Sequence, residues 1–222
     1  MDEIKINKLI RSRRKTICLI VAKDASLVVR APQTTPNRII RNFIDKKKRW
    51  IIKHQEIAKK RSSEITFKQF VDGEEFLYLG KYYPLKISDR EDIFLTDSLE
   101  FPRKMLMTAR ESLIKWYQDK ALDLISERVF QYERVVGLRS TSIAITKACR
   151  RWGSCGVKNT LNFSWRLILA PLGVIDYVVV HEVVHLSQKD HSKEFWRKVR
   201  ALIPDFSQYN KWLNKNGHLL TL

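Results

Sequence analysis

Residues 178–186 are the most restrictive segment of this 222-residue chain, because they place His181, Glu182 and His185 among valines and a leucine. The apolar surroundings predict a buried helix over about 174–186. On a helix, residues four apart lie on one face with Cβ atoms about 6 Å apart, so both imidazoles can reach one ion. Burying two histidines and a carboxylate without partners is costly. The segment therefore predicts a metal site on a buried helix.

The residue types at these positions suit zinc. Zinc binds histidine nitrogens at about 2.0–2.1 Å, and a catalytic zinc has three protein ligands and one open position. His181 and His185 supply two ligands, and we expect His191, six residues further on, to be the third. Glu194 is the alternative third ligand. Glu182 lies about 100° round the helix from His181, where it can accept a proton from water that zinc has acidified.

A second group of candidate residues precedes this helix. Residues 151–159 form a turn-rich segment, in which Trp152 offers an apolar wall and Ser154 or Cys155 can donate a hydrogen bond to an oxyanion. The alternative is a packed structural turn that supports the site. We predict that Trp152, Ser154 and Asn162 contact the substrate.

The hydrophobic pattern predicts an α+β fold. The expected strands form hairpins over 16–31 and 76–87 and a further pair at 142–146 and 160–167, and the expected helices span 35–61, 103–136, 174–186, 192–202 and 207–213. Thr35 is the expected cap of the first helix. Residues 88–102 are expected to form a connector or a short extra strand. We expect strand 160–167 to run along the metal cleft and to offer a free edge to an extended substrate.

Charge and cysteine content narrow the class of protein. The net charge is +18, and residues 1–61 hold 18 lysines and arginines against 5 acidic residues. This basic region could bind nucleic acid without sequence preference, or it could be only a solvated surface. Three cysteines fit a reducing cytoplasm better than a disulfide framework. The apolar runs are too short to cross a membrane, and the first residues lack the apolar stretch of a secretory signal.

Four segments of the C-terminal half, taken in order and with their spacing, resemble the YgjP-like branch of SprT-like metallopeptidases. They are Arg-Trp-Gly-Ser-Cys at 151–155, Leu-Asn-Phe-Ser-Trp-Arg-Leu at 161–167, Val-Ile-Asp-Tyr-Val-Val-Val-His-Glu at 174–182 and His-Ser-Lys-Glu-Phe-Trp at 191–196. The hydrophobic pattern and the charge predict a basic hairpin–helix–hairpin region over 1–90 and a second domain over 103–222 with a small antiparallel sheet. The resemblance implies that this second domain is a zincin-like catalytic domain. It also implies a Zn²⁺ cofactor, the three histidines as ligands and Glu182 as the catalytic base.

The function expected from these features is that of a zinc-dependent hydrolase, most consistent with a peptidase acting on peptides or proteins. One alternative is a metal-dependent hydrolase of nucleotides or other phosphoanhydrides, although the sequence has no Gly-rich phosphate loop. Another is a non-enzymatic nucleic-acid-binding module with a structural metal. Its weakness is that a structural zinc is normally closed by four ligands and has no use for Glu182.

Overall fold

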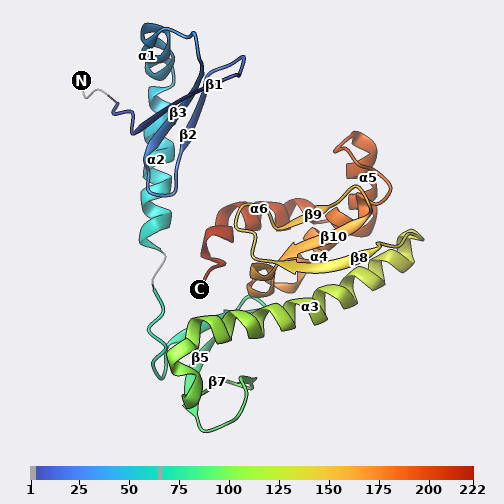
Figure 1. Cartoon of the computed structure of the whole chain (residues 1–222). Coiled ribbons are helices and arrows are strands. Elements are labelled where there is room, and N and C mark those ends of the chain that lie inside the picture. The colour runs from blue at the N-terminus through green and yellow to red at the C-terminus, as the bar shows by residue number, and fades with distance from the viewer. Residues whose placement is uncertain (1–3, 65–66) are drawn as a thin grey trace. The chain divides into compact units, whose positions relative to one another are not determined.

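The structure is a computed structural model that describes residues 4–64 and 67–222, and the chain divides into compact units at 1–66 and 67–222 (Figure 1). The hairpin that the sequence placed with the basic region falls in the second unit. Its residues Phe76 and Leu85 are buried in the core of that unit, which explains the grouping. The functional division of the chain between residues 90 and 103 stays a prediction.

The first unit contains a three-stranded sheet in the order β1-β3-β2. Its strands are β1 (Lys8–Ser12), β2 (Cys18–Val21) and β3 (Leu27–Pro32). The predicted hairpin is the antiparallel pair β2–β3. Strand β1 was not predicted, and it runs parallel to β3.

The helix predicted over 35–61 is two helices, α1 (Asn37–Lys46) and α2 (Lys48–Ser63), with a break at Lys47. No glycine or proline marks this break, so periodicity alone gives one continuous helix. Thr35 is not the cap, because Pro36 holds that position and no side chain caps the helix. Both helices bury isoleucines against β3, and this core consists of Leu27, Val29, Ala31, Ile40, Ile44 and Ile51.

The second unit begins with a four-stranded sheet in the order β4-β5-β7-β6. Its strands are β4 (Glu75–Tyr78), β5 (Lys81–Ser88), β6 (Phe94–Leu95) and β7 (Leu99–Pro102). The predicted hairpin is β4–β5. Residues 88–102, expected to form a connector or a short extra strand, hold the two short strands β6 and β7. A 3-10 turn, η1 (Arg103–Thr108), then leads into the long helix α3 (Ala109–Val136). Tyr117 ties α3 to this sheet by donating a hydrogen bond to the carbonyl of Leu77, at 2.9 Å.

The sheet next to the candidate site is formed by β8 (Ser142–Thr146), β9 (Gly153–Cys155) and β10 (Thr160–Ser164) in the order β8-β10-β9. It is mixed and not antiparallel as predicted, because β8 runs parallel to β10. Strand β10 is central and paired on both sides. The expectation that this strand offers a free edge is therefore wrong, and the edges belong to β8 and β9. A 3-10 turn, η2 (Trp165–Leu169), replaces the end of the predicted strand.

The chain ends in a group of helices, α4 (Leu172–Val184), α5 (Lys193–Leu202) and α6 (Phe206–Asn216), followed by the short turn η3 (Gly217–Leu219). The α4 helix packs against α3, α5 and α6 (Figure 1). An ion pair between Arg128 of α3 and Asp176 of α4, at 3.6 Å, helps to fix this packing. The α+β prediction is confirmed. In the described part of the chain, no helix is both long and apolar enough to cross a membrane.

Candidate metal centre

The α4 helix holds the first two histidines in a dry environment. Its valines are almost completely buried, so the helix is enclosed on several sides, as its apolar sequence predicts. His181 lies in its last turn, and His185 is its C-cap residue with a helical backbone. Their ring centroids are 4.9 Å apart. The four-residue spacing thus brings both imidazoles to one face of α4, as expected.

His191 reaches the same point from the loop that links α4 to α5. The Asp190 carboxylate accepts hydrogen bonds from the Gln188 side chain and the Ser192 backbone, which shapes this loop. Ser192 caps α5 by accepting a hydrogen bond from the backbone N–H of Phe195, at 3.4 Å. His191 is therefore held just outside the start of a capped helix.

The Nε2 atoms of the three histidines converge. The His191 Nε2 lies 3.0 Å from that of His181 and 3.2 Å from that of His185. One ligand atom from each histidine lies within 4.8 Å of the others. Nitrogens about 2.0–2.1 Å from a tetrahedral zinc stand roughly 3.3 Å apart. The spacing therefore fits a single metal ion.

The protonation of these rings also suits a metal. The His185 Nδ1 donates to the carbonyl of Gln188, at 2.8 Å, because a carbonyl only accepts. In neutral His185 the lone pair is then on Nε2, which faces the other two rings. Burial, reinforced by His185 and His191, lowers the pKa of His181 to about 4. A neutral imidazole is the form that binds a metal.

Aromatic side chains of α5 form one wall of the centre. The ring of Phe195 lies between 4.5 and 4.9 Å from each of the three imidazoles, centroid to centroid. The ring of Trp196 stacks on His191 at 5.9 Å. These rings restrict the imidazoles and exclude water from one side of the centre. The spacing of the histidines did not indicate this wall.

Glu182 follows His181 on α4, and its side chain is only 6% exposed. Burial raises the pKa of its carboxyl to about 7, whereas the backbone N–H of Cys155 and the charge of Arg151 act in the opposite direction. A pKa in this range suits a group that exchanges protons near neutral pH. Gly153 makes room for this carboxyl, because a Cβ there would stand 2.6 Å from Glu182 Cγ.

The alternative ligand Glu194 points elsewhere. Its carboxylate accepts two hydrogen bonds from Arg197, at 2.8 and 2.7 Å. It is not part of the histidine group. The geometry therefore favours His191 as the third ligand, although the ligand assignment remains a prediction.

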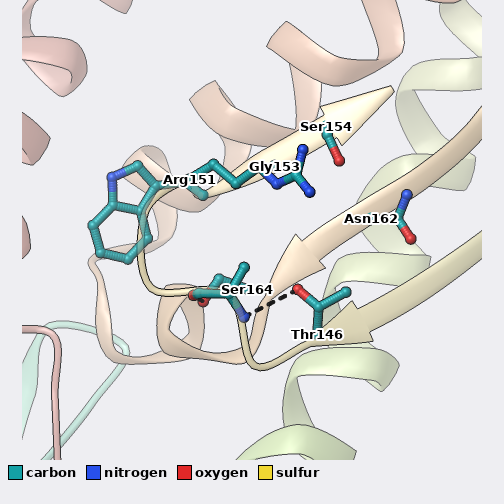
Figure 2. A pocket seen from close by; sticks show the side chains of 8 residues that line it. Thr146, Arg151, Gly153, Ser154, Asn162 and Ser164 are labelled. Carbon is teal, nitrogen blue, oxygen red and sulfur yellow. Dashed lines mark hydrogen bonds between the residues drawn. The ribbon is translucent and has the colours of Figure 1, made fainter. Parts of the chain in front are cut away.

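The predicted substrate-binding residues lie together, on the face of the β8-β10-β9 sheet opposite to the one that Glu182 contacts. Trp152, Ser154 and Asn162 line one pocket of about 210 Å³ (Figure 2). Trp152 also packs against Gly217, where an added Cβ would stand 2.8 Å from its ring. Sequence reasoning did not single out Arg151, which lines the same pocket and acts on Glu182. Its place at the start of the Arg-Trp-Gly-Ser-Cys motif was the available signal.

The family described as YgjP-like, metallopeptidase domain, matches residues 15–216. The chain belongs to this family.

The resemblance recognised in the sequence is thus confirmed, and the match includes the basic region from residue 15 onward. A YgjP-like metallopeptidase domain indicates a hydrolase, and the three-histidine group indicates a metal-binding site. No curated protein matches the chain. Among solved structures, the metallopeptidase zymogen of Pyrococcus abyssi abylysin is similar, with a TM-score of 0.38 and 17% identity over 41% of this chain and 93% of that one.

Proposed function

We propose that this chain is a zinc-dependent peptidase in which His181, His185 and His191 hold the metal and Glu182 is the general base. The observation that carries the proposal is the convergence of three histidine Nε2 atoms, and the buried Glu182 follows the first of these histidines on the same helix. Three protein ligands leave a zinc with an open position, which is the arrangement of catalytic sites. The metallopeptidase domain of the family supports the same interpretation.

Zinc, when bound, would polarise the substrate carbonyl and acidify water. Glu182 accepts the proton of the attacking water and delivers it to the leaving amine. The backbone N–H of Cys155 and the charge of Arg151 favour the ionised form of Glu182 that this first transfer requires. Phe195 and Trp196 hold the imidazoles in place during the reaction.

The β9 strand offers a place for an extended substrate. Just beyond the two ends of β9, backbone hydrogen bonds join the Gly156 N–H to the Thr160 carbonyl and the Ser164 N–H to the Trp152 carbonyl. Because antiparallel pairs alternate, the backbone groups of Gly153 and Cys155 are then directed away from β10. Glu182 accepts the N–H of Cys155, so a substrate would pair with the backbone of Gly153 and the carbonyl of Cys155. This outer edge lies beside Glu182, whose side chain abuts Gly153. A peptide that pairs with β9 therefore passes the catalytic base, which supports a peptide over a nucleotide as substrate.

The substrate class can be tested by metal removal and replacement. Protein stripped with a chelator should cleave none of a mixed set of unstructured peptides, and stoichiometric zinc should restore cleavage. Mass spectrometry of the products measures both. Nucleoside triphosphates run in parallel test the alternative hydrolase. Zinc-dependent release of phosphate or pyrophosphate without peptide cleavage would replace the peptidase proposal with the nucleotide one.

A further inference from the structure

The pocket in Figure 2 contains side-chain hydrogen-bond donors that the proposed reaction does not use, although the charge of Arg151 acts on Glu182. It is lined by Thr146, Ala148, Arg151, Trp152, Gly153, Ser154, Asn162 and Ser164. Thr146 and Ser164 are occupied, because each makes hydrogen bonds to neighbouring backbone groups. Arg151, Ser154 and Asn162 make no side-chain hydrogen bond to any residue that the structure describes. All three can donate hydrogen bonds into the pocket.

The lining of this pocket and the sequence around it carry basic but no acidic side chains. None of the lining residues is acidic. The surrounding sequence, from residue 134 to 175, holds seven lysines and arginines and no aspartate or glutamate. A planar guanidinium next to hydroxyl and amide donors is the arrangement that binds a carboxylate or a phosphate well.

The pocket and the catalytic base lie on opposite faces of β9. Ser154 is paired with Asn162 across the two strands, so their side chains share one face. A Cβ on Gly153 would meet Glu182, so the catalytic base lies on the other face. Side chains of an added strand alternate between faces. A peptide along β9 would thus direct alternate side chains to Glu182 and to the pocket.

We propose that Arg151, Ser154 and Asn162 form a specificity subsite that binds a carboxylate of the peptide substrate. The carboxylate comes either from an acidic side chain or from the free C-terminus. The proposal rests on the peptidase function and adds the chemical class of substrate. Arg151 supplies the charge and a bidentate contact, and Ser154 and Asn162 supply further donors. The volume of about 210 Å³ accommodates the end of one such side chain.

The test measures affinity and not turnover. Metal-loaded Glu182→Gln protein is titrated with fluorescent peptides that differ only in one position, Glu in one and Gln in the other, both with amidated C-termini. Further pairs, with the Glu or Gln at other positions of the peptide, show which substrate position the subsite binds. A second kind of pair, without acidic side chains, compares a free C-terminus with an amidated one. One of the carboxylate peptides should bind about ten-fold more tightly than its amide partner.

Two arginine variants in the same background decide whether the pocket is responsible. Arg151→Gln should reduce the ratio between the affinities for the carboxylate peptide and its amide partner to about one. Arg150→Gln is the matched control, because Arg150 is exposed and does not line the pocket, and it should leave the ratio unchanged. Equal affinities in the Arg151-containing protein, or a ratio that survives Arg151→Gln, would overturn the proposal.

The outcomes also separate this proposal from the proposed function. Cleavage of peptides by the metal-loaded wild type without any preference for a carboxylate defeats the subsite and leaves the peptidase intact. Absence of all peptide cleavage defeats the peptidase. Arg151-dependent binding of ATP, together with equal affinity for both members of each peptide pair, would assign the pocket to phosphate and overturn the carboxylate subsite.

Discussion

At the scale of single residues, the third metal ligand is the assignment that one substitution tests best. His191→Ala removes one of the three converging nitrogens, so the zinc affinity should fall by orders of magnitude. Glu194→Ala should leave the zinc content unchanged, because Arg197 holds that carboxylate outside the histidine group. Elemental analysis after dialysis against a weak chelator measures both. Full zinc retention in His191→Ala would require another ligand.

Glu182 also predicts an effect on stability that depends on pH. Burial raises its folded-state pKa to about 7 from the ordinary 4.5. Above pH 7 the folded protein carries a buried charge whose cost is fully present, and below about pH 4.5 the carboxyl is neutral in both states. Metal-free Glu182→Gln should therefore be more stable than wild type at pH 8, by about 3 kcal/mol.

That advantage of Glu182→Gln should fade as the pH falls towards 4.5. Gln keeps an oxygen that can accept the N–H of Cys155, so the difference in unfolding free energy does not come from loss of this hydrogen bond. Urea unfolding at the two pH values provides the free energies. If the unfolding free energies of the two proteins differ by the same amount at both pH values, Glu182 does not carry a buried charge.

The residues of the site were predictable to different degrees. His181, Glu182 and His185 follow from local spacing on one helix, so sequence periodicity was sufficient to group them. His191 required a loop of the right shape, and Arg151 required a strand pairing that brings distant segments together. Such long-range arrangements leave no periodic signal in a single sequence.

At the scale of elements, the same limit explains the error over β10. The alternation of polar and apolar residues over 160–164 indicates a strand with one buried face, as observed for Leu161 and Phe163. It contains no information about how many neighbours the strand has. The short β9 was hidden in a turn-rich segment, because three residues are too few to show a period. The helices were easier, since each carries a local pattern over several turns.

The contact between β9 and α4 yields a prediction at this scale. Gly153→Ala adds a Cβ that would stand 2.6 to 2.8 Å from atoms of Glu182, so it should destabilise the fold by about 1–3 kcal/mol. In a Glu182→Ala background those atoms are absent, and the cost of Gly153→Ala should largely disappear. Urea unfolding of the four proteins gives the coupling energy. Strictly additive effects would show that Gly153 and Glu182 do not constrain each other.

At the scale of the whole molecule, the charge is concentrated in the first unit. Lys46 and Arg49 are exposed there, as are many of its other basic side chains. We expect this unit to bind nucleic acid without sequence preference, with an affinity that falls steeply between about 50 and 200 mM salt. Fluorescence anisotropy with labelled single- and double-stranded DNA provides the affinities.

Paired variants locate this binding. Replacing Lys46 and Arg49 by glutamine should weaken binding and reduce the salt slope by about one for each phosphate that the variant no longer neutralises. The same change at Arg110 and Lys120, exposed on α3 of the second unit, is the control. If both pairs weaken binding equally, the binding is not specific to the first unit. If no binding tighter than about micromolar appears at about 50 mM salt, the basic surface is only solvated.

The central claim for the whole protein is that a three-histidine zinc centre works with Glu182 to hydrolyse peptides. The most direct measurement is the rate of peptide cleavage by zinc-loaded wild type and Glu182→Gln, with zinc content determined in the same samples. The account predicts equal zinc and a loss of kcat by at least about two orders of magnitude in the variant. A Glu182→Gln protein that retains zinc and cleaves at the wild-type rate would contradict it.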